Sequence, residues 1–317
     1  MTEPMAVVPT MIRHPDPFSL DDDRAWRDWR ARKLADLPAS TDALLVEIND
    51  PFALSRGEQG ALLDRCTRWN MALYRLRRPG DALARDAGGG RFVRALGAQI
   101  GLHRLDRNWL AGDEGVSLLR VNPQGGVRGD YIPYTDRPIG WHTDGYYYPP
   151  ERRIDAMLLH CLCPAARGGG NRLLDPELAY LRLRELDPAH IAALSADDAM
   201  TIPAREADTR DDGDPQQAQR PAQSGPVFWR DPLDGRLRMR YTARTRSIVW
   251  NPDPATQAAR AALQTVLARE EDTITLRLGP GMGLICNNVL HTREAFVDDA
   301  QQTRRVLRAR YRERITG

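Results

Sequence analysis

The chain has 317 residues, 42% of them hydrophobic and 28% charged, which is the composition of a globular protein with a large buried core. Its 45 basic and 43 acidic residues leave a net charge of +2, without the excess of positive charge that nucleic-acid-binding proteins use against phosphates. No apolar run is long enough for a membrane span, and four cysteines are too few for a disulfide scaffold in a chain of this length.

The N-terminus lacks the basic start and apolar stretch of a secretion signal, so we expect a cytoplasmic protein. From there to about residue 110 the pattern is mainly helical. Apolar residues recur on one face of three segments, 23–36, 55–73 and 91–102, while ALLVEIN at 43–49 is typical of a strand.

After residue 110 short strands predominate. The predicted strands are 115–121, 154–162, 199–203, 226–230, 236–242, 272–278, 282–287 and 303–313. Helices are predicted at 176–186 and 254–269, and Asp234-Gly235 has the composition of a hairpin turn. The polar segment at about 205–225 is interpreted as a mobile insertion. Many short strands decorated by helices favour one domain over 1–317, mainly β with flanking helices and folded as a double-stranded β-helix (jelly-roll) barrel.

The motif Trp141-His142-Thr143-Asp144-Gly145 is the first candidate site. On a strand, residues two apart project to the same side, so one imidazole nitrogen and one carboxylate oxygen can reach the same metal ion. A further histidine would complete a facial triad, which leaves coordination positions open for other ligands. The spacing alone is weak, because the chain also contains His14-Pro15-Asp16 in a polar segment.

The second half of the site lies in CNNVLHTREAFVDDAQQTRRVLR, residues 286–308. His291 follows an apolar, strand-like run, and Arg305 comes fourteen residues later in another strand-like segment. An arginine at that place can bind the far carboxylate of an oxo-diacid as a bidentate pair.

These blocks together resemble the taurine dioxygenase and clavaminate synthase superfamily of iron(II)/2-oxoglutarate-dependent dioxygenases. WHTDG is similar to the family's first ligand pair, NNVLHTREAF to its distal-histidine block and RRVLR to its closing block. GPVFWRDPLDGRLRMRY and GGGNRLLDPELAYLRLREL also resemble family segments, and the blocks keep the family order over about residues 115–313.

The resemblance implies that His142, Asp144 and His291 bind iron(II) and that Arg305 holds 2-oxoglutarate. Many relatives carry a threonine two residues after a Gly-Gly turn, whereas Gly169-Gly170 is followed here by Asn171-Arg172, so Asn171 or Arg172 would take its place. The implied reaction oxidises, most simply hydroxylates, a C–H bond with release of succinate and CO₂. Asp144 argues against halogenation, because halogenating relatives replace this aspartate with a small residue.

The expected substrate is a small polar molecule bearing a carboxylate, with Tyr146, Arg244 and Arg308 as candidate binding residues. No nucleic-acid or membrane partner is expected, and relatives are often homo-oligomers. Two alternatives stay open: a metal-dependent enzyme that does not use 2-oxoglutarate, and a catalytically silent metal-binding jelly-roll protein.

Overall fold

The computed structural model describes residues 15–86, 88, 90–107, 112, 114–121, 131–204, 220–245 and 248–317. It divides the chain into two compact units, the first ending at Asp36 and the second running from Leu37 to Gly317. In the first unit, α1 (Asp23–Ala35) begins after Asp22, whose carboxylate accepts a hydrogen bond from the backbone N–H of Ala25.

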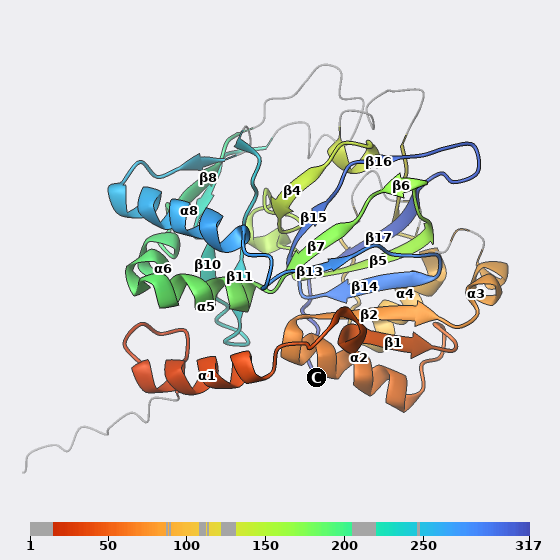
Figure 1. Cartoon of the computed structure of the whole chain (residues 1–317), viewed down its shortest axis with the longest axis horizontal. Coiled ribbons are helices and arrows are strands. Elements are labelled where there is room, and N and C mark those ends of the chain that lie inside the picture. Colours follow the sequence, from red (N-terminus) through yellow and green to blue (C-terminus); the bar gives the residue numbers. More distant parts are fainter. Residues whose placement is uncertain are drawn as a thin grey trace, which may run out of the picture. The chain divides into compact units, whose positions relative to one another are not determined.

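The second unit is built around two β-sheets that enclose a shared core (Figure 1). The larger sheet has the strand order β1-β2-β14-β5-β17-β3, and only the β1–β2 pair is parallel among its pairs. Its strands are β1 (Leu45–Ile48), β2 (Met71–Leu76), β14 (Met282–Cys286), β5 (Ala156–Cys163), β17 (Arg305–Tyr311) and β3 (Ser117–Leu119). The smaller sheet has the order β13-β7-β15-β4, formed by β13 (Ile274–Leu276), β7 (Asn171–Leu174), β15 (Leu290–Arg293) and β4 (Ile139–His142).

The larger sheet is buried on both faces. Its inner face shares a core with the smaller sheet, in which Leu159 and Val306 lie in one cluster with Leu173. Its outer face packs in a second cluster with α2 (Arg56–Trp69) and α4 (Gly90–Gln99), to which β17 contributes Leu307, Ala309 and Tyr311. Alternate residues of β17 therefore belong to different cores, as the two-residue period of a strand requires.

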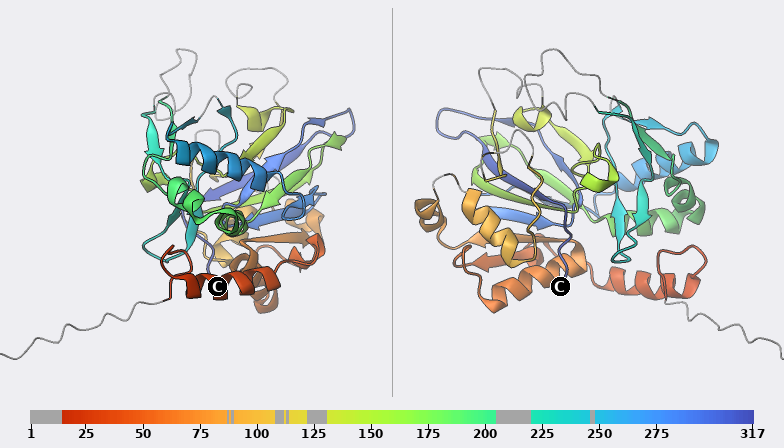
Figure 2. Two further views of the ribbon diagram at one scale, coloured as in Figure 1. Left: turned by 60° about the vertical axis from the view of Figure 1, so that its left-hand side comes forward. Right: turned by 180° about the vertical axis from the view of Figure 1, so that it is seen from behind.

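Capping residues explain where several helices begin. Ser55 and Glu58 form a capping box at the start of α2. Three further helices begin with proline directly after a capping aspartate: α5 (Pro176–Leu186), α6 (Pro188–Leu194) and α8 (Pro254–Leu267). These three helices pack against one another beside the sheets (Figure 2).

The remaining elements are short. They are α3 (Pro79–Arg85), the 3₁₀ helices η1 (Thr41–Leu44), η3 (Ile132–Tyr134) and η4 (Pro150–Arg152), and the strands β6 (Arg167–Gly168), β8 (Met200–Ile202), β9 (Gln223–Gly225), β10 (Phe228–Arg230), β11 (Leu237–Met239), β12 (Val249–Trp250) and β16 (Phe296–Val297). Strands β10 and β11 pair as the hairpin predicted at Asp234-Gly235.

Two predicted boundaries are wrong for local reasons. The helix predicted at 55–73 ends at Trp69, because Asn70 adopts a left-handed conformation (φ 59°), and the next residues form the central strand β2. His291 does not follow the strand that carries Leu284; a turn at Asn288 (φ 48°) separates β14 from β15, and His291 lies within β15.

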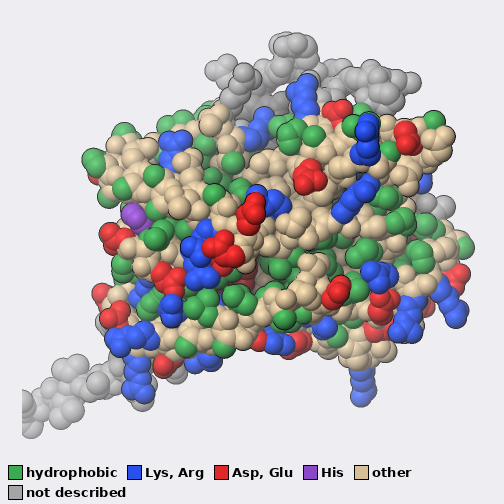
Figure 3. All heavy atoms as spheres, in the orientation of Figure 1, with side chains coloured by type: hydrophobic (Ala, Val, Ile, Leu, Met, Phe, Trp, Pro, Cys, Tyr) green, Lys and Arg blue, Asp and Glu red, His purple; other side chains and the backbone are tan. Residues whose placement is uncertain are grey.

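The other predictions of organisation have mixed outcomes. Most of the predicted insertion, residues 205–219, lies outside the described residues, whereas Gln223–Gly225 at its end forms β9. The arrangement of 1–317 as one domain stays a prediction. Within the described part, none of the helices combines the length and apolar character that a membrane span requires. On the face shown in Figure 3, acidic and basic side chains are interspersed.

A buried histidine lies in the outer core, away from the candidate metal ligands. The His160 side chain on β5 has 1% exposure; its Nδ1 is 2.9 Å from the hydroxyl of Tyr74, and the Phe92 ring meets it edge-on at 4.7 Å. Burial lowers the pKa of His160 to about 4. His160 is therefore neutral in the folded protein at neutral pH.

We predict that the buried His160, with its partner Tyr74, makes the free energy of unfolding depend on pH. The folded pKa of His160 lies below the unfolded value of 6.5, so the unfolded chain binds the proton first and stability falls as the pH drops from about 6.5 towards 4. At 1.36 kcal/mol per pKa unit, this loss amounts to about 3 kcal/mol. In urea unfolding of metal-free protein, Tyr74→Phe/His160→Leu should show a correspondingly shallower pH dependence, and the same slope as wild type would contradict the assignment.

Candidate metal centre

Strand pairing brings the two predicted histidine ligands together. His142, the last residue of β4, lies directly opposite His291 on β15 in the antiparallel register, and their ring centroids are 4.1 Å apart. Asp144 follows in the turn after β4, with Oδ1 3.8 Å from Nε2 of His142. One ligand atom from each of the three residues lies within 4.8 Å of the others. The geometry therefore offers a site for a single ion.

Hydrogen bonds orient both imidazole rings. Nδ1 of His142 donates to the carbonyl oxygen of Gly140 (3.0 Å), and Nδ1 of His291 donates to that of Val289 (2.9 Å). Because the proton is on Nδ1 in each ring, the lone pair of Nε2 is available to a metal.

The charge states also suit a metal site. Burial, together with the neighbouring His291, lowers the pKa of His142 to about 3, and burial lowers the pKa of His291. For Asp144, burial acts in the opposite direction, but the guanidinium groups of Arg308 and Arg310 outweigh it and hold the pKa well below its usual value. Two neutral imidazoles and one carboxylate are the donor set of the facial triad that binds iron(II), so the residues present fit this metal.

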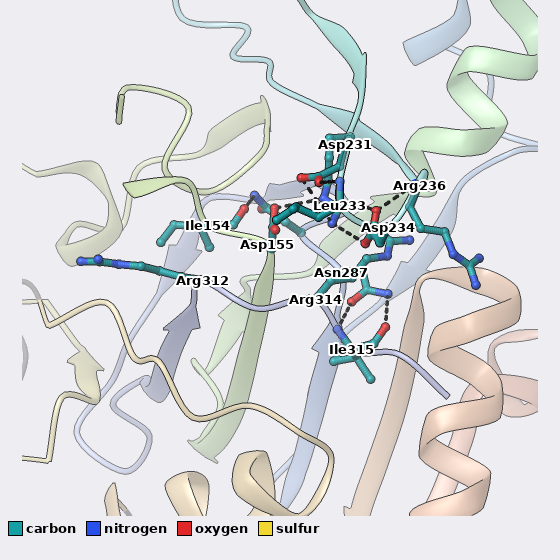
Figure 4. Close-up of polar contacts among 12 residues, drawn as sticks. Ile154, Asp155, Asp231, Leu233, Asp234, Arg236, Asn287, Arg312, Arg314 and Ile315 are labelled. Carbon is teal, nitrogen blue, oxygen red and sulfur yellow. Dashed lines mark hydrogen bonds and ion pairs between the residues drawn. The ribbon is translucent and has the colours of Figure 1, made fainter. Parts of the chain in front are cut away.

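The turn after β14 fixes the backbone of Asp144. The side-chain oxygen of Asn288 accepts from the N–H of Asp144 (2.7 Å), and its amide donates to the carbonyl oxygens of Asp144 (3.0 Å) and Ile154 (2.6 Å). Asn287 exchanges hydrogen bonds with the backbone of Ile315, as Figure 4 shows. Asn287 and Asn288 do not stand out in the sequence as functional residues, although two asparagines between strand-like runs are a turn signal.

Strand parity separates the arginines of the closing block. Arg305, at the start of β17, is exposed, whereas Arg308 lies on the inner face with Nη1 3.5 Å from Oδ2 of Asp144. Arg304 is 6% exposed and lines a small inner pocket with Gly169 and Asn171. The described residues form no ion pair with Arg304. The structure thus places Arg304, and not Arg305, where an anion could be held inside the barrel.

The Asn171-Arg172 pair also divides between two faces. Asn171 points into the pocket of Arg304, and its amide donates to the carbonyl oxygen of Thr292 (2.8 Å). The guanidinium of Arg172 lies 5.3 Å from the ring centre of Trp141, on the other face of the smaller sheet. Asn171 is therefore the residue of this pair that is available to a ligand inside the barrel.

The predicted substrate residues are placed differently from one another. Tyr146 is half-buried in the turn after Asp144, with its ring 5.2 Å from that of Tyr147. Arg308 contacts the metal ligand Asp144, as described above, whereas Arg244 is exposed, two residues after Thr242, which pairs with His142. Of these three residues, Arg308 is thus the one whose side chain contacts a predicted metal ligand.

Comparison with known proteins identifies relatives of this chain. The model of the family described as taurine catabolism dioxygenase TauD, TfdA family, matches residues 90–310. A uridine-5'-phosphate dioxygenase from Streptomyces sp is 33% identical over 187 residues, covering 56% of this chain and 62% of the relative. A protein of the same name from Amycolatopsis sp is 28% identical over 183 residues, covering 55% and 60%. The chain thus spans about three fifths of the length of these relatives.

Solved structures confirm the jelly-roll class. Asparagine oxygenase in complex with Fe(II), 3-hydroxyasparagine and succinate superposes with a TM-score of 0.55 at 18% identity, covering 81% of this chain and 78% of that chain. The non-heme iron oxygenase OrfP in complex with Fe and alpha-ketoglutaric acid gives 0.57 at 17% identity, covering 81% and 80%. At these identities the likeness shows the fold.

We predict that Asp144→Ala abolishes tight binding of a divalent metal, because it removes the only anionic member of the triad. Titration of metal-free protein with Co(II), a redox-stable substitute for iron(II), followed by its visible absorption, measures the effect. Asp272→Ala is a matched control, since Asp272 is also a buried carboxylate and pairs with Arg182 and Arg269. Unchanged affinity in the Asp144 variant would refute the site.

Proposed function

The chain belongs to the TauD/TfdA family of taurine catabolism dioxygenases, and we propose that it is an iron(II)/2-oxoglutarate-dependent dioxygenase. Its reaction would convert a C–H bond of a small polar substrate, 2-oxoglutarate and O₂ into the hydroxylated product, succinate and CO₂. The observation that carries this proposal is the cluster of His142, Asp144 and His291, with both Nε2 atoms available and the carboxylate ionised. Bound at these residues, iron(II) would supply the oxidising chemistry.

The protein's own residues would provide binding, orientation and charge. His142 and His291 are kept neutral by burial and are aimed by their backbone hydrogen bonds, so they bind metal without first losing a proton. Asn288 bonds to both the N–H and the carbonyl oxygen of Asp144, which fixes the backbone that carries this carboxylate. Such outer contacts are what fix ligand geometry in metal sites.

We assign the anchoring of 2-oxoglutarate to Arg304 and Asn171 in place of Arg305 and Arg172. The Arg304 guanidinium lines the inner pocket, packs over the Phe296 ring and forms no ion pair with the described residues, and Asn171 lines the same pocket. A distal carboxylate can accept a bidentate pair from the former and a hydrogen bond from the latter. An anion site with these donors also favours an enzyme that uses 2-oxoglutarate over a metal-dependent enzyme that does not. That alternative was open because Asn171-Arg172 replaces the threonine found in many relatives.

The substrate we propose bears an oxyanion, with a nucleoside 5'-phosphate as the first candidate. Relatives at 33% and 28% identity are named uridine-5'-phosphate dioxygenases. In this chain the partly exposed Arg308 lies next to the metal ligands, where it could bind a substrate phosphate as well as the carboxylate first expected.

A cytoplasmic location is also proposed, since all four cysteines are free, as suits a reducing compartment. All three predicted metal ligands come from this one chain. Assembly into a homo-oligomer stays a prediction.

We predict iron-dependent formation of succinate from 2-oxoglutarate, accelerated by uridine 5'-phosphate. Protein reconstituted with iron(II) without air is exposed to O₂, and succinate and oxidised nucleotide are measured by mass spectrometry. Uridine, which lacks the phosphate, is the matched control and should stimulate succinate formation less.

The outcomes of this assay separate the two parts of the proposal. Succinate formation that neither nucleotide nor nucleoside stimulates would reject the substrate and leave the dioxygenase. No succinate under any condition, with iron demonstrably bound, would reject the dioxygenase.

We predict that Arg304→Met raises the KM for 2-oxoglutarate about 10- to 100-fold, the loss expected for a hydrogen-bonded ion pair worth roughly 1.5–3 kcal/mol. Arg305→Met is the matched control on the neighbouring residue. Because Arg305 is exposed, its removal should change this KM by no more than about twofold. The opposite ranking of the two variants would restore Arg305 as the anchor.

A further inference from the structure

Besides Asp144, another buried carboxylate lies near the metal centre. It belongs to Asp106, which lies beside the C-terminal end of β17, next to Arg310. Asp106 is 1% exposed, and its Oδ2 accepts a hydrogen bond from Nη2 of Arg310 at 2.6 Å. Its backbone N–H also donates to the carbonyl oxygen of Arg310 at 2.8 Å. Three more groups approach the same carboxylate: the hydroxyl of Tyr148 at 3.0 Å, Nη2 of Arg152 at 3.4 Å and Nη2 of Arg312 at 4.0 Å.

Arg310 lies close to the candidate iron ligands. It shares the inner face of β17 with Arg308, and side chains two residues apart on a strand are about 7 Å apart. Arg308 is itself 3.5 Å from Asp144. Arg310 also donates from Nη1 to the hydroxyl of Tyr147 at 3.2 Å, which ties it to the turn that begins at Asp144. Arg308 therefore contacts the carboxylate of Asp144, and Arg310 lies two residues further along the same face of β17.

The charges around the carboxylate of Asp144 suggest a role for Asp106 in metal binding. A divalent cation at the triad would add two positive charges beside Arg308 and Arg310, with Asp144 as the negative member. A buried charge without a partner is costly, and like charges in a poorly solvated site repel strongly. Arg310 without Asp106 would either turn to Asp144, in competition with the metal, or repel the metal from where it stands.

We propose that Asp106 is a positioning residue for the metal centre: its carboxylate holds the Arg310 guanidinium beside Tyr147 and Tyr148 and offsets its charge, which leaves Asp144 free to bind the cation. This inference rests on the proposed iron site. Its distinctive consequence is that the metal affinity depends on the Asp106 charge mainly through Arg310, since Arg152 and Arg312 lie further from the carboxylate, at 3.4 Å and 4.0 Å. A residue that merely supports the fold would be needed with or without Arg310.

The test compares Asp106→Asn with Asp106→Asn/Arg310→Met by Co(II) titration of metal-free protein, alongside circular dichroism and thermal unfolding. Asparagine keeps the size of Asp106 and one acceptor oxygen, and it removes the charge. We expect affinity to fall about 10- to 100-fold in the single variant, the range typical of outer-shell changes at metal sites. The double variant should return to within about threefold of wild type, as a pairwise coupling requires.

Asp272→Asn is the matched control, because Asp272 is a buried carboxylate with two arginine partners in another part of the fold. It should lower thermal stability without changing the affinity for Co(II). If Asp106→Asn does not fold, the double variant decides alone: affinity near wild type supports the proposal, and a tenfold loss overturns it.

Other results reject the proposal or its premise separately. Wild-type affinity in Asp106→Asn, or an equal loss in the single and double variants, would overturn the role of Asp106 while the iron site stands. Failure of the wild-type protein to bind Co(II) would reject the iron site, and the inference with it.

Discussion

The register between β4 and β15 is the constraint on which the site depends. It sets His142 opposite His291, so that two residues far apart in the sequence present their rings on one face of the smaller sheet. Because side chains alternate along a strand, a slip of one residue would turn one ring to the opposite face. Asn288, in the turn that leads into β15, then binds the backbone of Asp144. One stretch of chain thus supplies a ligand and positions another.

The electrostatics of the interior follow from the same arrangement. Burial favours the neutral form of both histidines, whereas the carboxylate of Asp144 stays ionised because Arg308 and Arg310 lie near it. The strand that brings these arginines is β17, whose outer face packs in the helix-covered core through Leu307, Ala309 and Tyr311. The polar centre and the outer hydrophobic core therefore share one strand, and packing against α4 helps to set where the inner arginines stand.

The sequence predicts that His142, Asp144 and His291 lie together, as they do in the structure, because the signals for them are local. A His-x-Asp pair needs only strand geometry, and ordered blocks around His291 indicate which distant histidine joins it. Which arginine of the closing block faces the interior cannot be predicted from the sequence, for a tertiary reason. In the run RRVLRAR, arginines occupy both parities, so the sequence does not say which face is inside. The pairing of β17 with β5 also shifts register between Arg305 and Val306, which no local pattern reveals.

Asp106 illustrates a further limit of local reasoning. It lies in an unremarkable segment, Leu105-Asp106-Arg107, and its partner Arg310 is 204 residues away in the sequence. Nothing in either segment indicates the pair; only the approach of residue 105 to Tyr311 as an added bridge beside β17 brings them together. If buried arginines are used to bind anions at the centre, some must be neutralised from elsewhere in the fold. If the role proposed for Asp106 holds, the N-terminal part would act on the metal centre through charge, although the predicted iron ligands all come from the strands and turn of the smaller sheet.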